Sequence, residues 1–99
     1  MTPAELYTIL NEAGDNVVCI YFTATWCGPC RKVTPLVQTF VDRYPNLRVY
    51  KVDADECKQL LDQHNVSTLP TLEFFKHGQV ISRHTGSRMV EEAFMKAME

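Results

Sequence analysis

The continuous apolar run from Val17 to Phe22 constrains the fold of this chain more than any other segment. Six successive β-branched, aromatic and small apolar residues are typical of a strand that is covered on both faces. Apolar residues at helical intervals follow it, and they predict a helix over 29–43. A second β-rich segment, 47–53, completes a strand-helix-strand unit, which requires parallel pairing through a right-handed crossover. The run therefore predicts a central strand in a sheet that helices cover.

The rest of the chain predicts three more helices and a hairpin. Thr2, Pro3 and Glu5 have the spacing of a capping box that starts a helix, and Gly14 is a left-handed stop. Asp55 is the expected cap of a short third helix. The predicted strands are 17–23, 47–53, 71–76 and 79–84, and the predicted helices are 3–13, 29–43, 56–63 and 87–98. This pattern is α/β: a central mixed sheet of about four strands with helices on both faces.

Length and charge exclude several classes of protein. Ninety-nine residues are enough for one domain, 1–99, whose core needs no disulfide or structural metal. A net charge of −2 gives no basic surface for nucleic acid or anionic lipid. The chain has no run of about 20 apolar residues that could span a membrane, and its first residues lack the basic stretch followed by an apolar one that is typical of a secretory leader. We expect a cytoplasmic protein; an organelle form that has lost its transit peptide is the alternative.

Two of the four cysteines stand where the central strand gives way to the predicted helix. At a spacing of three residues, Cys27 and Cys30 share one face of a helix, so their sulfur atoms can form a disulfide. Cys27 lies at or just before the first helical residue, where free N–H groups and the helix dipole stabilise a thiolate. Gly28 leaves room for a partner sulfur, and Pro29 suits the first turn. We predict that Cys27 attacks substrate disulfides and that Cys30, one turn inside the helix, resolves the mixed disulfide.

Two structural uses of this cysteine pair are the alternatives. A disulfide that closes so short a loop contributes only about 2 kcal/mol in the chain-entropy model. A structural zinc ion usually needs four ligands, and the other candidates, Cys19, Cys57 and three histidines, are scattered singly along the chain. We therefore predict redox chemistry and no metal site, because the pair lies in the strand-to-helix context that such chemistry requires.

Three features of the chain resemble the thioredoxin family, and they are Trp26-Cys27-Gly28-Pro29-Cys30, Leu69-Pro70-Thr71, and Gly78 with Gly86. The likeness extends over essentially the whole chain. It implies the thioredoxin fold and a thiol-disulfide oxidoreductase that reduces protein disulfides without a bound cofactor. It further implies re-reduction by an NADPH-dependent thioredoxin reductase, so that NADPH is used indirectly. By family analogy, the protein substrates include peroxiredoxins, ribonucleotide reductase and methionine sulfoxide reductase.

The resemblance also implies a docking rim for substrates. Trp26, Leu69, Pro70 and Gly86 would form it, with Pro70 after a cis peptide bond and against the dithiol. The backbone of Leu69 would pair with an extended substrate segment, a mode of binding that tolerates many sequences. The alternatives are a partly buried core aromatic for Trp26 and a simple turn for Gly86.

Two departures from the family pattern bear on mechanism and assembly. Tyr21 stands where thioredoxins usually carry a buried aspartate, and a phenol is a poor base at neutral pH. We expect Cys30 to be activated less well, or through water or Lys51, which matches a family lysine near the site. The capping box at Thr2 leaves no room for the family's first strand, so 47–53 would be a sheet edge. Charges at Arg48 and Lys51 discourage pairing along that edge, and we expect a monomer.

The resemblance favours a cytosolic thioredoxin, and two other functions are the alternatives. One is a thioredoxin-fold binding module whose dithiol is idle and whose groove holds a partner. The other is an oxidase or isomerase of the disulfide-isomerase type, which usually has a histidine between the cysteines. Gly28 and Pro29 lack that positive charge, which favours a reductant. Cys57 resembles a position of extra, regulatory cysteines in some animal thioredoxins, although a lone cysteine at a helix start is more often incidental.

Overall fold

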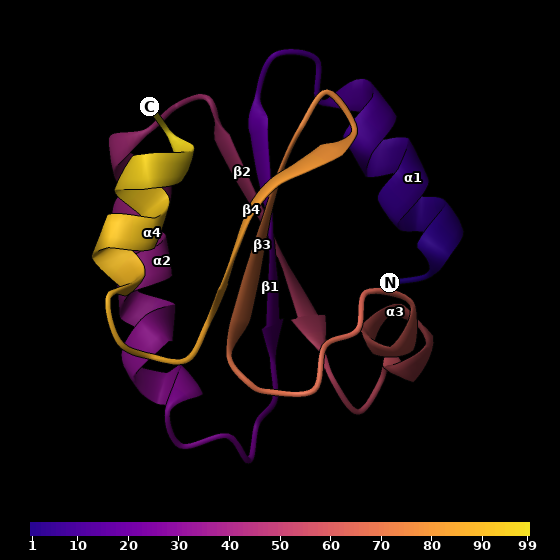
Figure 1. The fold of residues 1–99 in the computed structure, drawn as a ribbon, viewed down its shortest axis with the longest axis vertical. Helices are drawn as coiled ribbons and strands as arrows, with labels where there is room; N and C mark the ends of the chain where they lie inside the picture. Colours follow the sequence, from indigo (N-terminus) through magenta and orange to yellow (C-terminus); the bar gives the residue numbers. More distant parts are fainter.

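A four-stranded mixed sheet lies at the centre of the computed structural model, which describes residues 1–99 (Figure 1). The elements in chain order are α1 (Pro3–Glu12), β1 (Val17–Thr23), α2 (Cys30–Arg43), β2 (Leu47–Asp53), α3 (Lys58–Gln63), β3 (Thr71–Lys76), β4 (Gln79–Thr85) and α4 (Val90–Ala97). The strand order is β2-β1-β3-β4, with β1 parallel to β2 and antiparallel to β3. Every residue of β1 is buried, which confirms the predicted central strand.

Helices cover both faces of the sheet, as Figure 1 shows, with α2 and α4 on one side and α1 and α3 on the other. Successive residues of β1 point to opposite faces. Cys19 and Tyr21 pack in a core cluster with residues of α2 and α4, whereas Ile20 and Phe22 pack with residues of α1 and α3. The apolar run is continuous because the strand has a core on each side.

Local sequence signals set the ends of α1 and the turn of the hairpin. The hydroxyl of Thr2 accepts a hydrogen bond from the Glu5 amide over 3.1 Å, and the Glu5 carboxylate accepts one from the Thr2 amide over 2.9 Å. Gly14 has a φ of +60° just after α1. His77 and Gly78, between β3 and β4, both have positive φ, as a two-residue hairpin turn requires. The capping box, the glycine stop and the hairpin are thereby confirmed.

The predicted helix ends need correction. The first helix ends at Glu12 instead of residue 13, and the last ends at Ala97 instead of 98. The last helix begins at Val90 and not at residue 87, because Met89 has a left-handed backbone with φ +59°, which a right-handed helix cannot include. The third helix begins at Lys58 and not at 56, since Cys57 has non-helical dihedral angles.

Two further boundaries shift by one residue. The second helix begins at Cys30 instead of residue 29. The fourth strand extends to Thr85 instead of 84, because Thr85 pairs with Thr71 on β3. The other three predicted strands have the predicted bounds.

Strand β2 lies at one edge of the sheet and pairs only with β1 within residues 1–99. Arg48 and Lys51 are exposed on it.

The longest helix, α2, has 14 residues, and no helix has both the length and the apolar character needed to cross a bilayer.

Candidate active site

Cys27 and Cys30 form a disulfide at the carboxyl end of β1. Their Cα atoms are 5.4 Å apart. Cys30 is the first residue of α2, whereas the sequence predicted a position one turn inside the helix. Cys27 therefore lies in the loop before the helix, with Gly28 and Pro29 forming the turn between the two cysteines.

The sulfur of Cys27 is aimed at the start of α2. It accepts a hydrogen bond from the backbone N–H of Cys30 over 3.3 Å. That N–H is one of the first-turn donors that have no partner within the helix. A donor in this position stabilises a thiolate on Cys27 after the disulfide is reduced.

A groove of about 500 Å³ opens beside Cys27. Two segments line it together with Ala54 and Leu61: residues 26–29, which we call the first wall, and residues 66–69, which we call the second wall. Cys27 lines this groove and Cys30 does not. A molecule in the groove therefore meets Cys27 first.

Trp26 stands at the rim of the groove with 66% of its surface exposed. Its indole N–H donates a hydrogen bond to the carboxylate of Asp55 over 2.8 Å. Asp55 is thus not the cap of α3, contrary to the prediction. The carboxylate of Asp53 instead accepts from the amides of Asp55 and Glu56, because it precedes the turn that leads into the helix.

The other predicted rim residues lie next to one another. The Leu69-Pro70 peptide bond is cis, and Leu69 lines the groove. Pro70 is buried, and its carbonyl accepts a hydrogen bond from the Gly86 amide over 2.8 Å. Gly86 has a φ of +92°, a backbone conformation that L side chains rarely adopt. Neither Pro70 nor Gly86 lines the groove itself.

A second, smaller cavity of about 200 Å³ adjoins both cysteines. Lys51, Thr34 and Asp53 line it. Tyr21 lies near the same helix start but contacts the backbone: its hydroxyl donates to the Cys30 carbonyl over 3.0 Å and lies 3.1 Å from the Thr34 hydroxyl. The structure thus brings Lys51 to the dithiol and directs the phenol of Tyr21 to the helix.

The two remaining cysteines lie away from the groove. Cys19 is fully buried, and burial raises the pKa of its thiol far above the usual range, with a smaller contribution from the charge of Glu73. Cys57 is also buried, and its sulfur accepts a hydrogen bond from the amino group of Met1 over 3.1 Å, which raises the pKa of that amino group. No three His, Cys, Asp or Glu side chains form a group that could hold a metal ion.

Sequence reasoning missed most of the second wall of the groove. Val66, Ser67 and Thr68 carry no motif, and they line the groove because the tertiary structure brings the segment after α3 to residues 26–29. One residue of the sequence could have pointed to the contacts that hold this wall. Glu73 is an acidic residue inside an otherwise apolar strand, and such a residue needs a partner when it is buried.

Comparison with known proteins agrees with this geometry. The thioredoxin family model matches residues 1–99. Thioredoxin of Ovis aries is 38% identical over 78 residues, which cover 79% of this chain and 74% of the sheep protein. Thioredoxin-2 of Saccharomyces cerevisiae is 39% identical over 84 residues, covering 85% of this chain and 81% of the yeast protein.

The fold is also that of solved thioredoxins. The X-ray structure of Fasciola hepatica thioredoxin superposes with a TM-score of 0.89 at 30% identity, over 97% of this chain and 94% of that one. The mixed sheet with helices on both faces is therefore the thioredoxin fold, as the sequence resemblance predicted. With a disulfide-bonded Cys27-Cys30 pair at the end of its central strand, this chain belongs to the thioredoxin family of thiol-disulfide oxidoreductases.

Proposed function

We propose that this protein reduces disulfides of other proteins, with Cys27 as the attacking thiolate and Cys30 as the resolving thiol. The thiolate of Cys27 attacks one sulfur of the substrate, a mixed disulfide forms, and the second substrate sulfur leaves as a thiolate. The thiolate of Cys30 then attacks the sulfur of Cys27. The Cys27-Cys30 disulfide forms, and the substrate leaves as a dithiol that has gained two electrons.

The observation that carries this assignment is the unequal setting of the two sulfurs. Cys27 lines the large groove and accepts the Cys30 amide hydrogen bond. Cys30 does not line the groove, although it adjoins the smaller cavity, as Cys27 also does. The nucleophile must meet the substrate from the groove, whereas the resolving thiol needs to reach only Cys27.

Substrate docking is assigned to Trp26, Leu69, Pro70 and Gly86. The exposed ring of Trp26 supports this role, because a large apolar side chain beside a reactive sulfur is suited to cover a bound segment. The backbone of Leu69 would pair with an extended stretch of the substrate. Pro70 and Gly86 would hold Leu69 in place, which their 2.8 Å hydrogen bond supports.

Gly28, Pro29, Tyr21 and Lys51 are assigned to tuning of the dithiol. The uncharged Gly28-Pro29 turn favours a reductant over an oxidant, because no positive charge between the cysteines stabilises the reduced form. The position of Lys51 in the cavity beside Cys30 supports a role in activating that thiol.

Family membership supports the proposed partners, whereas the proposed compartment rests on the sequence expectation. We propose re-reduction by an NADPH-dependent thioredoxin reductase, electron transport to substrates such as peroxiredoxins, ribonucleotide reductase and methionine sulfoxide reductase, and a cytoplasmic location. The protein would act as a monomer of one domain, residues 1–99, and bind no cofactor, nucleic acid or membrane. Its redox group is the Cys27-Cys30 pair alone.

One assay tests this function. NADPH oxidation is followed with a thioredoxin reductase, the protein and insulin as the disulfide substrate. We expect turnover by the wild-type protein and none by Cys27→Ser, whereas Cys57→Ser serves as the matched control and retains turnover. Inactivity with several reductases would instead support a binding module. A dithiol potential close to that of disulfide isomerases would support an oxidase or isomerase.

A further inference from the structure

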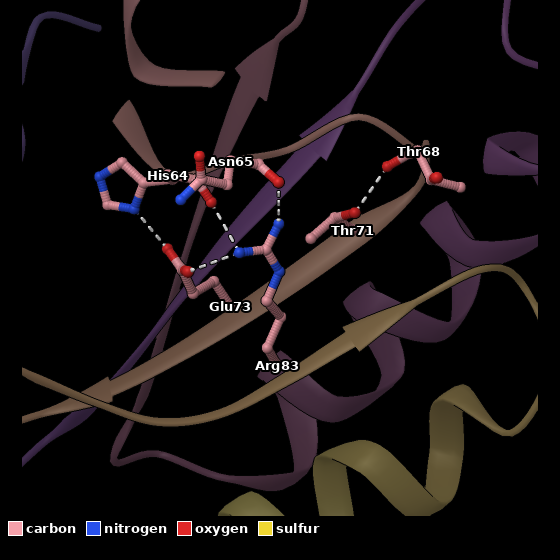
Figure 2. A network of polar contacts seen from close by, with 6 residues as sticks. All are labelled: His64, Asn65, Thr68, Thr71, Glu73 and Arg83. Carbon is pink, nitrogen blue, oxygen red and sulfur yellow. Dashed lines mark hydrogen bonds and ion pairs between the residues drawn. The ribbon is translucent and has the colours of Figure 1, made fainter. Parts of the chain in front are cut away.

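A polar network holds the turn that leads into the second wall of the groove (Figure 2). Arg83 extends from β4 to this turn. Its guanidinium donates hydrogen bonds to the carbonyl of His64 over 2.6 Å and to the carbonyl of Asn65 over 2.8 Å. Figure 2 shows the two contacts diverging from one guanidinium group.

The carboxylate of Glu73 also lies beside that guanidinium. Its side chain is only 5% exposed, so its carboxylate requires partners. One carboxylate oxygen lies 2.6 Å from Nδ1 of His64, and the other lies 3.6 Å from Nη1 of Arg83. The charge of Glu73 therefore orients both the guanidinium and the ring of the residue at the turn.

The turn needs these contacts for a local reason. His64 follows the last residue of α3, where carbonyl groups have no partner within the helix. Asn65 has a φ of +54°, a left-handed conformation that the right-handed helix α3 cannot include. Arg83 satisfies both carbonyl groups, and the next residue, Val66, is the first of the groove wall.

The far end of the same wall is also tied to the sheet. The hydroxyl of Thr71, at the start of β3, donates to the carbonyl of Thr68 over 2.6 Å (Figure 2). The wall, residues 66–69, is thus anchored to β4 through Arg83 at one end and to β3 through Thr71 at the other. Both anchors lie outside the groove.

We propose that Arg83, oriented by Glu73, is a positioning residue that holds residues 66–69 in the shape that binds protein substrates beside Cys27. This inference rests on the proposed function, since it concerns docking to the same groove. Arg83 touches neither sulfur and takes no part in the thiol exchange. Its removal loosens the wall, which weakens docking of a polypeptide and leaves the attack on a small disulfide unchanged.

The shape of the guanidinium group makes the role specific to arginine. Its planar fork reaches two carbonyl groups while it faces a carboxylate. A lysine at this position retains the positive charge near Glu73 but has a single, compact ammonium group. Arg83→Lys therefore keeps the ion pair with Glu73 and loses the double contact with the two carbonyl groups. The variant shows which of the two interactions holds the wall.

The test compares two substrates of the pre-reduced protein, without a reductase. The second-order rate constants for oxidation by insulin and by hydroxyethyl disulfide are measured by acid quenching and thiol alkylation. For Arg83→Met we expect about a tenfold loss with insulin, the scale of one charge-assisted hydrogen bond, and less than about a twofold change with the small disulfide. Arg48→Met is the matched control, since Arg48 also donates to a backbone carbonyl but on β2, outside the groove. It should change neither rate.

Hydrogen exchange of the backbone amides gives a second readout. The amides of residues 66–69 should exchange faster in Arg83→Met and in Arg83→Lys, and those of β1 should not. If Arg83→Met does not fold, Arg83→Lys carries the test, with the same selective loss toward insulin. Unchanged reduction of insulin, or an equal loss with both substrates, would overturn the inference. A wild-type protein inert toward both disulfides would instead contradict the proposed function.

Discussion

The hydroxyl of Tyr21 donates a hydrogen bond to the backbone carbonyl of Cys30 over 3.0 Å, from the central strand to the first residue of α2. The phenol therefore supports the helix that carries the dithiol and contacts no sulfur. A carboxylate at this buried position would act differently, because it could accept a proton from the Cys30 thiol. We therefore predict that resolution of the mixed disulfide takes place without a base at position 21.

Replacing Tyr21 with aspartate tests this point. We expect Tyr21→Asp to resolve the mixed disulfide faster near neutral pH than Tyr21→Asn, since both remove the ring and only aspartate can take the proton. The measurement is the decay of the mixed disulfide after mixing the reduced protein with a disulfide substrate and quenching in acid. Equal rates for the two variants would show that a carboxylate here gives no advantage.

Lys51 and Arg31 are the two cationic residues that line the cavity next to both cysteines, and Lys51 is the one on β2. Lys51→Met should slow resolution of the mixed disulfide, because a positive charge favours the thiolate form of Cys30. A charge effect of about 1 kcal/mol corresponds to about a fivefold slowing. Lys76→Met is the control and should have the wild-type rate, because Lys76 is the last residue of β3, at the end away from Pro70. A Lys51→Met protein as fast as this control would remove Lys51 from the mechanism.

Cys19 should be unreactive in the folded protein. Burial raises the pKa of its thiol well above the usual range, so that it holds its proton and cannot be reached. After reduction of the disulfide, iodoacetamide should modify Cys27 in the native state and Cys19 only after unfolding in guanidinium chloride. Peptide mass spectrometry distinguishes the sites. Labelling of Cys19 at the rate of Cys27 would contradict the buried position.

The capping box of α1 should contribute measurably to stability. Thr2→Ala removes the hydroxyl that accepts the Glu5 amide, and we expect it to lower the free energy of unfolding by about 1 kcal/mol. Thr8→Ala is the matched control, because Thr8 is exposed within the same helix and its hydroxyl bonds only to the preceding turn. Urea titration measures both. A Thr2→Ala protein as stable as Thr8→Ala would show that the cap contributes nothing.

The same cap predicts a dependence on pH. The pKa of Glu5 is lowered below its ordinary 4.5. The largest cause is the hydrogen bond from the Thr2 backbone N–H, and the next is the hydrogen bond with the Thr2 side chain. A lowered pKa stabilises the folded state above 4.5, and this contribution is lost as the pH falls through the folded value. The stability difference between wild type and Glu5→Gln should therefore shrink below pH 4.5. A difference that grows on acidification would have the wrong sign.

The exposed edge at β2 should not support assembly. Gel filtration under reducing conditions should give a monomer of 11.4 kDa. The exposed charges of Arg48 and Lys51 oppose pairing with a second edge, so the double variant Arg48→Val, Lys51→Val should associate as its concentration rises. A wild-type dimer would mean that these two charges do not protect the edge.

Much of the fold was predictable because its signals are local. The residues of β1 are apolar at every position, and the Thr2-Glu5 box starts α1 with the expected contacts. The start of α4 was not predictable, since the left-handed backbone of Met89 is an uncommon conformation for methionine, and no turn residue marks it. Asp55 was misassigned because its carboxylate bonds to Trp26, 29 residues earlier in the chain.

By itself, the amino-acid sequence determined the central strand, the helices around it and the dithiol at the strand's end, because each depends on residue spacing within a short segment. Only the tertiary structure decided which residues line the groove together with Cys27. Residues 66–69 line it, and the turn before them is bonded to Arg83, which lies on β4. Side chains far apart in the chain meet only after the sheet has formed, so no local pattern specifies them.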